Sequence, residues 1–398
     1  MPKKARIREI ELLRGLAFLA VALQHAIAHY SVVADVKVED GVIMTFLLMA
    51  SKFAVPVFIF ITGLVLFYNY DGQINYFSFV RKRFMDILVP YILWSAVYFL
   101  VSPAWNVHQL SKWVNMLFTG KNSYHLWYIV MIFQFYLLFP LFRYFMRKCT
   151  QWLPYKWRAA ALAAAGLLCL LLLDNLFRIS DVMTRVDLPF LTPFFTKYAD
   201  RNFLYFMIYF ILGAAAGMHP DRWNLWLEKG KVIYWTAFIG LFGYYAYITV
   251  RSFGYGSEAG LHVAFNQLNL LRPLITVFLV CSIFVFYEWS QKRTQQSGPA
   301  GLDLMNTLGR YSYGAYLVHA LMLRESYKID EWLFGGWNVT LRMVMTFLIC
   351  IILSYGLTIA MSYLPFGKWT VGVSSLPKKQ RRYVPNQGQT PMRSVDGS

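Results

Sequence analysis

Ionisable side chains recur on one face of the first apolar segment, residues 10–30. An acid, an arginine and two histidines share that face at helical spacing: Glu11, Arg14, His25 and His29. Arg14 and His25 are three turns apart, or roughly 16 Å along a helix. A neutral imidazole accepts a proton from a hydroxyl near neutral pH, so His25 is a candidate general base. Arg14 is a candidate for binding an anionic group or for orienting Glu11.

A second interpretation of the same face involves no chemistry. Glu11 and Arg14 form an ordinary pair at the membrane interface, and His25 hydrogen-bonds to a neighbouring helix. Periodicity alone favours neither interpretation. Ionisable residues inside a span cost roughly 2.5–3.5 kcal/mol at mid-bilayer and usually mark functional sites. In the functional interpretation, this face lines a polar cavity that joins the cytoplasmic mouth of the protein to His25.

Three consecutive cations, Arg81, Lys82 and Arg83, precede another apolar segment. Such a group at the cytoplasmic mouth is a candidate for binding the phosphates of a soluble cofactor. An ordinary positive-inside anchor explains the same residues, and the spacing alone favours that second reading.

A histidine with two aromatic residues opens a further apolar segment: His125, Trp127 and Tyr128. Tyrosine and tryptophan there are typical of an interfacial belt. Flat aromatic faces also suit sugar rings, so these three residues are candidates for binding an acceptor. His319 and Lys52 lie within spans as well; an interhelical hydrogen bond is the favoured role of His319. For Lys52, pairing with an acid and facing a cavity stay open as alternatives.

The composition predicts that membrane helices position all of these residues. The chain is 58% hydrophobic and 15% charged, whereas a soluble protein is about one quarter charged. Its apolar residues form solid blocks of roughly 20, which predict helices and not the alternating strands of a barrel. The net charge of +18 is divided among many short loops, which argues against nucleic-acid binding. The four cysteines form no CxxC pair, and no metal site is expected.

We therefore predict an all-α polytopic membrane protein, a bundle of about ten transmembrane helices. The first segment lacks a cleavage site and is expected to be retained. The predicted spans are Ile10–Tyr30, Ile43–Asn69, Phe84–Ser102, Tyr124–Met146, Ala159–Leu176, Phe203–Met218, Val232–Val250, Leu270–Tyr287, Leu308–Leu323 and Val339–Leu364.

The distribution of lysine and arginine predicts the orientation of the bundle. With the N-terminus inside, roughly two cations lie on the cytoplasmic side for each one outside, so both termini are expected in the cytoplasm. Residues 1–367 are expected to form one transmembrane domain. Residues 368–398 are polar and basic, and we expect a disordered cytoplasmic tail.

Four blocks of sequence occur in an order that is typical of one family. The most specific is an acid, an arginine three residues later and a histidine after ten more residues. The second is a Pro-x-Phe-rich run that ends in a hydroxyl residue followed by glycine. The others are a His-Leu-Trp-Tyr block and a Ser-Tyr block that ends in histidine. Together they resemble the acyltransferase-3 family of membrane-bound acyltransferases, over roughly residues 7 to 365. The blocks are Ile10–Ala17 with His25, Val55–Gly63, His125–Tyr128 and Ser312–His319.

Two positions depart from the family pattern. Thr62 replaces the usual serine and keeps the hydroxyl. Many relatives carry Arg-x-x-Arg before the proline of the third helix, and here the matching positions are Arg83 and Asp86. Arg81 and Lys82 are candidates to compensate for the missing arginine.

The resemblance implies transfer of an acyl group, usually acetyl and sometimes succinyl, from cytoplasmic acyl-CoA to a carbohydrate hydroxyl. Acyl-CoA is then a co-substrate, and no tightly bound cofactor is expected. The catalytic residues would be His25, Arg14 and Glu11, and His25 would activate the acceptor or carry the acyl group transiently. Donor phosphates would lie at Arg14 and at residues 81–83. The acceptor would bind outside, at His125, Trp127 and Tyr128.

A transporter or flippase for a polysaccharide or a lipid-linked sugar is the alternative prediction, because ten helices with internal charges suit transport too. Transporters often contain paired half-sequences. No convincing internal repeat is visible, which favours the enzyme. A catalytically idle partner is disfavoured by the intact pair of Arg14 and His25. The resemblance implies the bacterial cytoplasmic membrane as the location, and polysaccharide-synthesis machinery as a candidate partner.

Overall fold

The computed structural model describes residues 7–102, 110–255 and 261–375. Within these ranges the chain is helical, apart from two short antiparallel strands, β1 (Gly254–Tyr255) and β2 (Leu261–His262). The helices as far as residue 186 are α1 (Glu9–Tyr30), α2 (Val38–Ser51), α3 (Ala54–Asn69), α4 (Tyr76–Arg83), the π-helical η1 (Phe84–Leu88), α5 (Val89–Leu100), α6 (Leu110–Thr119), α7 (Trp127–Trp152), α8 (Tyr155–Asp174) and α9 (Leu176–Val186). The later helices are α10 (Leu191–Phe195), η3 (Ala199–Arg201), η4 (Phe203–Phe206), α11 (Met207–Met218), α12 (Pro220–Arg251), η5 (Asn266–Leu268), α13 (Pro273–Gln296), α14 (Pro299–Phe334), α15 (Val339–Ser362) and α16 (Gly367–Val371).

Eight helical segments of the described chain are long and apolar enough to cross a membrane. A shorter apolar stretch matches the predicted span Phe203–Met218, and the predicted span Leu308–Leu323 lies inside α14, which is not among the eight. The prediction of a multispan helical bundle is confirmed, whereas the count of ten and the orientation stay predictions. The eight segments are Glu9–Tyr30, Val38–Asn69, Tyr76–Leu100, Trp127–Trp152, Lys156–Asp174, Pro220–Arg251, Pro273–Gln296 and Val339–Ser362.

Two of these segments are interrupted. Between α2 and α3 the chain turns at Lys52 and Phe53, in the middle of the segment Val38–Asn69. Between α4 and α5 lies η1, directly before Pro90. Proline has no N–H to continue the helical ladder, and a π-helical turn accommodates the change. Both interruptions lie on helices that build the site described below.

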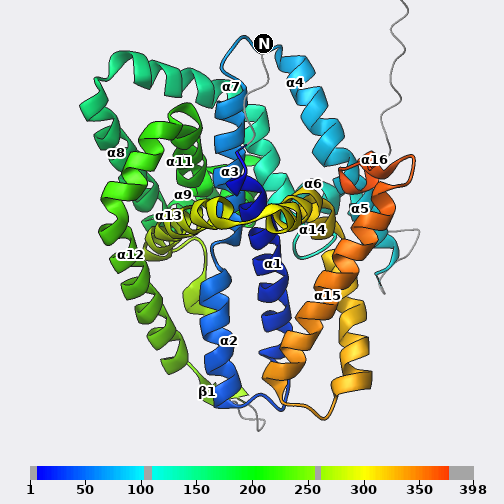
Figure 1. The fold of residues 1–398 in the computed structure, drawn as a ribbon. Coiled ribbons are helices and arrows are strands. Elements are labelled where there is room, and N and C mark those ends of the chain that lie inside the picture. Colours follow the sequence, from blue (N-terminus) through cyan, green and yellow to red (C-terminus); the bar gives the residue numbers. More distant parts are fainter. Residues whose placement is uncertain (1–6, 103–109, 256–260, 376–398) are drawn as a thin grey trace, which may run out of the picture.

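Helix α1 lies at the centre of the bundle (Figure 1). In its apolar window 67% of the residues are buried, against 11% in the span Lys156–Asp174. Helices α3, α13, α14 and α15 all pack against α1. Figure 1 shows α15 beside the lower part of α14, and α2 running alongside α1 towards the lower end of the view. The helix with the candidate catalytic residues is therefore held from several sides.

Glycines allow two pairs of helices, α1 with α14 and α3 with α11, to pack closely. A Cβ on Gly309 of α14 would collide with the backbone of Glu11 in α1, so no larger residue fits at this crossing. A Cβ on Gly63 of α3 would likewise meet the Phe210 carbonyl of α11. Small residues at such contacts are the usual means by which membrane helices approach.

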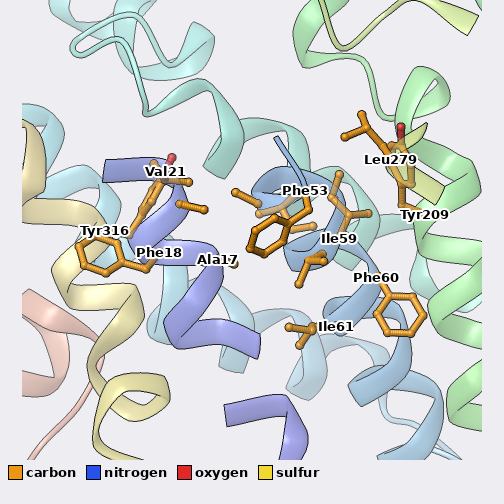
Figure 2. Close-up of a cluster of buried hydrophobic side chains, with 14 of the residues drawn as sticks. Ala17, Phe18, Val21, Phe53, Ile59, Phe60, Ile61, Tyr209, Leu279 and Tyr316 are labelled. Atoms are coloured by element: carbon orange, nitrogen blue, oxygen red, sulfur yellow. The ribbon is translucent and has the colours of Figure 1, made fainter. Parts of the chain in front are cut away.

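The middle of α1 is sealed by packing. Phe18 and Ala22 are completely buried (0% exposed each), and Figure 2 shows Phe18 and Val21 next to Tyr316 of α14. On the other side of α1, Figure 2 places Phe53 and Ile59 in the same core. The polar face of α1 is therefore interrupted between Arg14 and His25.

The chain beyond residue 367 begins with ordered structure. Residues Gly367–Val371 form α16, which packs against α5 and α14. Ser375 then donates its backbone N–H to the carbonyl of Ser362 at 2.9 Å. Residues 368–375 thus belong to the folded bundle, although we expected the tail to start at 368; residues 376–398 lie outside the described part.

Candidate active site

A cavity of about 240 Å³ opens beside the first half of α1. We call it the arginine cavity, because Arg14, Arg83 and Arg310 line it together. Its walls come from α1, α3, α4, η1, α7 and α14 and include Thr62, the hydroxyl residue that replaces the family serine. The remaining lining residues are Phe58, Ile61, Val65, Leu66, Ile87, Tyr128, Ile129, Ile132, Tyr136, Gly309, Ser312, Tyr313 and Tyr316.

All three arginines have protein contacts, and Arg310 donates from Nη2 to the Ser374 carbonyl at 3.1 Å. Arg14 Nη1 lies 3.4 Å from Glu11 Oε1, and the carboxylate is the more buried of the two groups. Arg83 donates from Nη2 to the Tyr70 hydroxyl at 3.2 Å, and its guanidinium lies 5.3 Å from the Tyr136 ring. The Nε of Arg83 is buried without a hydrogen-bond partner among the described residues. A donor in that position is available to an anionic ligand.

The neighbouring cations of the predicted donor site lie elsewhere. Arg81 and Lys82 are exposed and do not line the arginine cavity. Asp86, which takes the place of the family's second arginine, forms an ion pair with Lys368 of α16 at 3.1 Å. The third cation of the cavity is instead Arg310 of α14, which the sequence did not assign to the site. Arg310 lies two residues before the Ser312–His319 block, and this position was the feature of the sequence that could have indicated a role in the site.

Three histidines meet beyond the far end of the cavity. We call His25, His125 and His319 the histidine cluster. The ring centroids of His25 and His319 are 5.5 Å apart and nearly parallel, and those of His125 and His319 are 4.5 Å apart. The cluster joins α1, the turn before α7, and α14. Sequence reasoning placed His125 in an acceptor site and left His319 as an interhelical hydrogen bond, because spacing along the chain does not reveal that three helices converge.

The hydrogen bonds of the cluster leave two ring nitrogens unused. His319 Nδ1 lies 2.5 Å from the Tyr316 carbonyl oxygen, so this nitrogen is the donor and Nε2 keeps its lone pair. His125 Nδ1 lies 3.1 Å from Ser123 Oγ. Both Nε2 atoms are buried without a hydrogen-bond partner among the described residues. No group of three potential ligands in the described chain has the arrangement of a metal site.

Two tyrosines separate the arginine cavity from the histidine cluster. Tyr128 and Tyr316 line the cavity, with ring centroids 5.9 Å apart. Tyr316 also reaches the cluster, where its ring lies 5.2 Å from His125 and 5.5 Å from His319. His25 is not a lining residue of the cavity. The single open cavity that we expected from Arg14 to His25 is therefore divided in this structure, because aromatic side chains fill the space between them.

The three predicted acceptor residues lie in different places. His125 belongs to the histidine cluster, and Tyr128 lines the arginine cavity. Trp127 packs against Phe206 at 6.0 Å, on another side of α7. The aromatic residue next to His25 is Tyr124, whose ring lies 4.5 Å from the imidazole and which is 54% exposed. Tyr124 begins the same aromatic block and was not singled out by the sequence.

Comparisons with known proteins identify the family of this chain. A family model described as an acyltransferase domain, of the acyltransferase-3 type, matches residues 7–360. The chain belongs to the acyltransferase-3 family. A relative from Bacillus subtilis (strain 168), YfiQ, provisionally named a membrane-bound acyltransferase, is 23% identical over 344 residues, covering 81% of this chain and 82% of its own. No solved structure gives a significant match. This acyltransferase-3 protein is thus a multispan membrane protein of an acyl-transferring family, and nothing in the comparisons favours the transporter.

Proposed function

We propose that this protein transfers an acetyl or succinyl group from cytoplasmic acyl-CoA to a hydroxyl of a cell-surface or exported carbohydrate. One observation carries the proposal: a cavity lined by three arginines is also lined by Tyr128 and Tyr316, and Tyr316 contacts the histidine cluster. Coenzyme A carries several phosphates on one end and a thin thioester arm on the other. The arginines of the cavity suit the phosphates, and these two tyrosines lie on the path that the thioester arm would take.

The donor would bind with its phosphates at Arg14, Arg83 and Arg310. Guanidinium groups bind phosphate oxygens through charge-assisted, often bidentate hydrogen bonds. The unused Nε of Arg83 is one such donor. The pantetheine arm would then extend past Thr62 towards Tyr128 and Tyr316, and these two rings must move aside for the thioester to reach the cluster.

The acceptor would approach His25 from the opposite side, past the exposed ring of Tyr124. His25 is half-buried, whereas His125 and His319 are 1% and 0% exposed. His25 is therefore the member of the cluster that a hydroxyl can reach, and it would take the proton as the oxygen attacks the thioester. His319, nearly parallel to His25, would hold the ring in position.

This arrangement requires the arginine cavity to face the cytoplasm, which contains acyl-CoA, and the histidine cluster to lie towards the outer side. The excess of cations predicted on the inner side supports that orientation. In a bacterium the location would be the cytoplasmic membrane, where enzymes of polysaccharide synthesis are candidate partners.

Mass spectrometry of surface glycans, from cells with and without this protein, tests the proposal. We expect a mass increase of one acetyl or one succinyl group per modified sugar when the protein is present. Purified protein should also bind acyl-CoA. Identical glycans in both cells, together with no acyl-CoA binding, would contradict the proposal.

A further inference from the structure

Lys52 occupies an unusual position for a charged residue. It lies between α2 and α3, in the middle of a 32-residue apolar segment. About 20 helical residues suffice to cross a bilayer, so Lys52 is far from both ends of the span. A charge at that depth is costly unless something compensates for it.

The part of the chain that the structure describes offers Lys52 no counter-charge. Among the described residues its ammonium has neither a hydrogen-bond acceptor nor an acidic partner, and the side chain is half-buried. The sequence left open whether Lys52 pairs with an acid or faces a cavity. In the described part of the chain, no acid pairs with Lys52. A lysine retained in this way is expected to meet a negative charge that arrives from elsewhere.

Lys52 and His25 are brought together by a hydrogen bond between their neighbours. The Gln24 side-chain amide donates to the Ser51 carbonyl at 2.7 Å, so the residue before His25 is bonded to the residue before Lys52. Phe53 is stacked on Phe286 of α13, with centroids 3.7 Å apart, so the turn that carries Lys52 is fixed.

We propose that Lys52 stabilises the negative charge that forms on the acyl carbonyl oxygen during transfer; this rests on the proposed function. The acceptor oxygen attacks the thioester carbonyl carbon while His25 takes the hydroxyl proton. The carbonyl electrons move to oxygen, beside Lys52. When the carbonyl reforms, the C–S bond breaks, and the thiolate receives the proton from His25. The products are the acylated sugar and free coenzyme A.

Lys52→Met tests this assignment, because methionine has a similar length and no charge. We expect turnover to fall about 100- to 1,000-fold, the usual loss for one group that stabilises an oxyanion. The KM for the acceptor and the Kd for acyl-CoA should stay unchanged. Lys52→Arg should recover part of the turnover. Lys37→Met is the matched control, since Lys37 is exposed at the start of α2, and it should keep full activity.

Thermal unfolding supplies a second readout. Removing an unpaired charge from a span should leave the melting temperature unchanged or raise it. A lower melting temperature would show that Lys52 has a structural partner, and would overturn the proposal.

Three kinetic outcomes separate the possible failures. An active wild type with an equally active Lys52→Met variant would overturn the assignment of Lys52 and leave the proposed function intact. A raised acceptor KM at unchanged turnover would also overturn it, and would assign Lys52 to binding an acidic acceptor. A wild-type protein that transfers no acyl group would overturn the proposed function and the Lys52 assignment together.

Discussion

The arginine cavity and the histidine cluster share α1 and α14, yet they are built in opposite ways. The cavity is open space bordered by charged side chains, and its cations come from three helices. The cluster is closely packed, with His125 and His319 buried and aromatic rings around them. A large, highly charged ligand needs the first kind of environment. A base that must act on one oxygen atom needs the second, because packing fixes its orientation.

The contrast also separates binding from chemistry. Residues of the cavity should determine how tightly the donor binds, and residues of the cluster should determine how fast the acyl group moves. Tyr128 and Tyr316 form the boundary between them. The predictions below change one region, both regions or neither, and each examines how donor binding and turnover respond.

The largest effect is expected from His25→Ala. Removal of a general base lowers turnover by about 100- to 10,000-fold, while acyl-CoA binding should persist because His25 does not line the cavity. Glycan acylation in cells and acyl-CoA binding by purified protein measure the two effects. His29→Ala is the control one turn further along α1, since His29 is exposed and stacked on Tyr327. Normal acylation by the His25 variant would remove the base from the mechanism.

Arg310→Gln should weaken donor binding. A charged hydrogen bond contributes about 1.5–3 kcal/mol, so the Kd for acyl-CoA should rise about 10- to 100-fold. Turnover at saturating acyl-CoA should stay close to that of the wild type. Titration calorimetry in detergent gives the Kd, and dephospho-CoA serves as a ligand with one phosphate fewer. An unchanged Kd would exclude Arg310 from the donor site.

The sequence predicted the helical bundle because a chain that crosses a bilayer must satisfy its own backbone hydrogen bonds, and long apolar runs do so as helices. It also singled out Arg14 and His25, since an ionisable residue inside a span stands out against its neighbours, and Arg83, as one of three consecutive cations. It did not predict that Phe18 and Ala22 close the face between Arg14 and His25. Periodicity shows which face a residue is on, but not what packs against that face.

The sequence also did not predict which cations line the arginine cavity, and the physical reason is the same. Arg81, Lys82 and Arg83 are adjacent in sequence, but successive residues of a helix point in different directions, and only Arg83 of the three lines the cavity. Arg310 reaches the cavity from a helix more than 200 residues later, through the close approach that Gly309 permits. Such convergence depends on the packing of helices that are distant in sequence, and no local pattern encodes it.

Gly309→Val should disturb both regions together. The new side chain would collide with Glu11, and forced overpacking costs about 1–3 kcal/mol. If α14 moves away from α1, then Arg310 and His319 move with it, so donor binding and turnover should both fall. Gly356→Val is the matched control, because a Cβ at Gly356 of α15 meets nothing within 4 Å. Thermal unfolding would distinguish a local shift from a general loss of stability.

The smallest effect is expected from Arg81→Gln combined with Lys82→Gln. Both side chains are exposed and absent from the cavity lining, and exposed charges typically contribute about 0–1 kcal/mol to a specific contact. The Kd for acyl-CoA should therefore change by less than about fivefold at physiological salt. Any loss of affinity that appears at low salt should disappear as salt rises, since screening removes long-range attraction. A loss as large as that of Arg310→Gln would show that the loop itself binds phosphate, and that the donor site extends beyond the cavity.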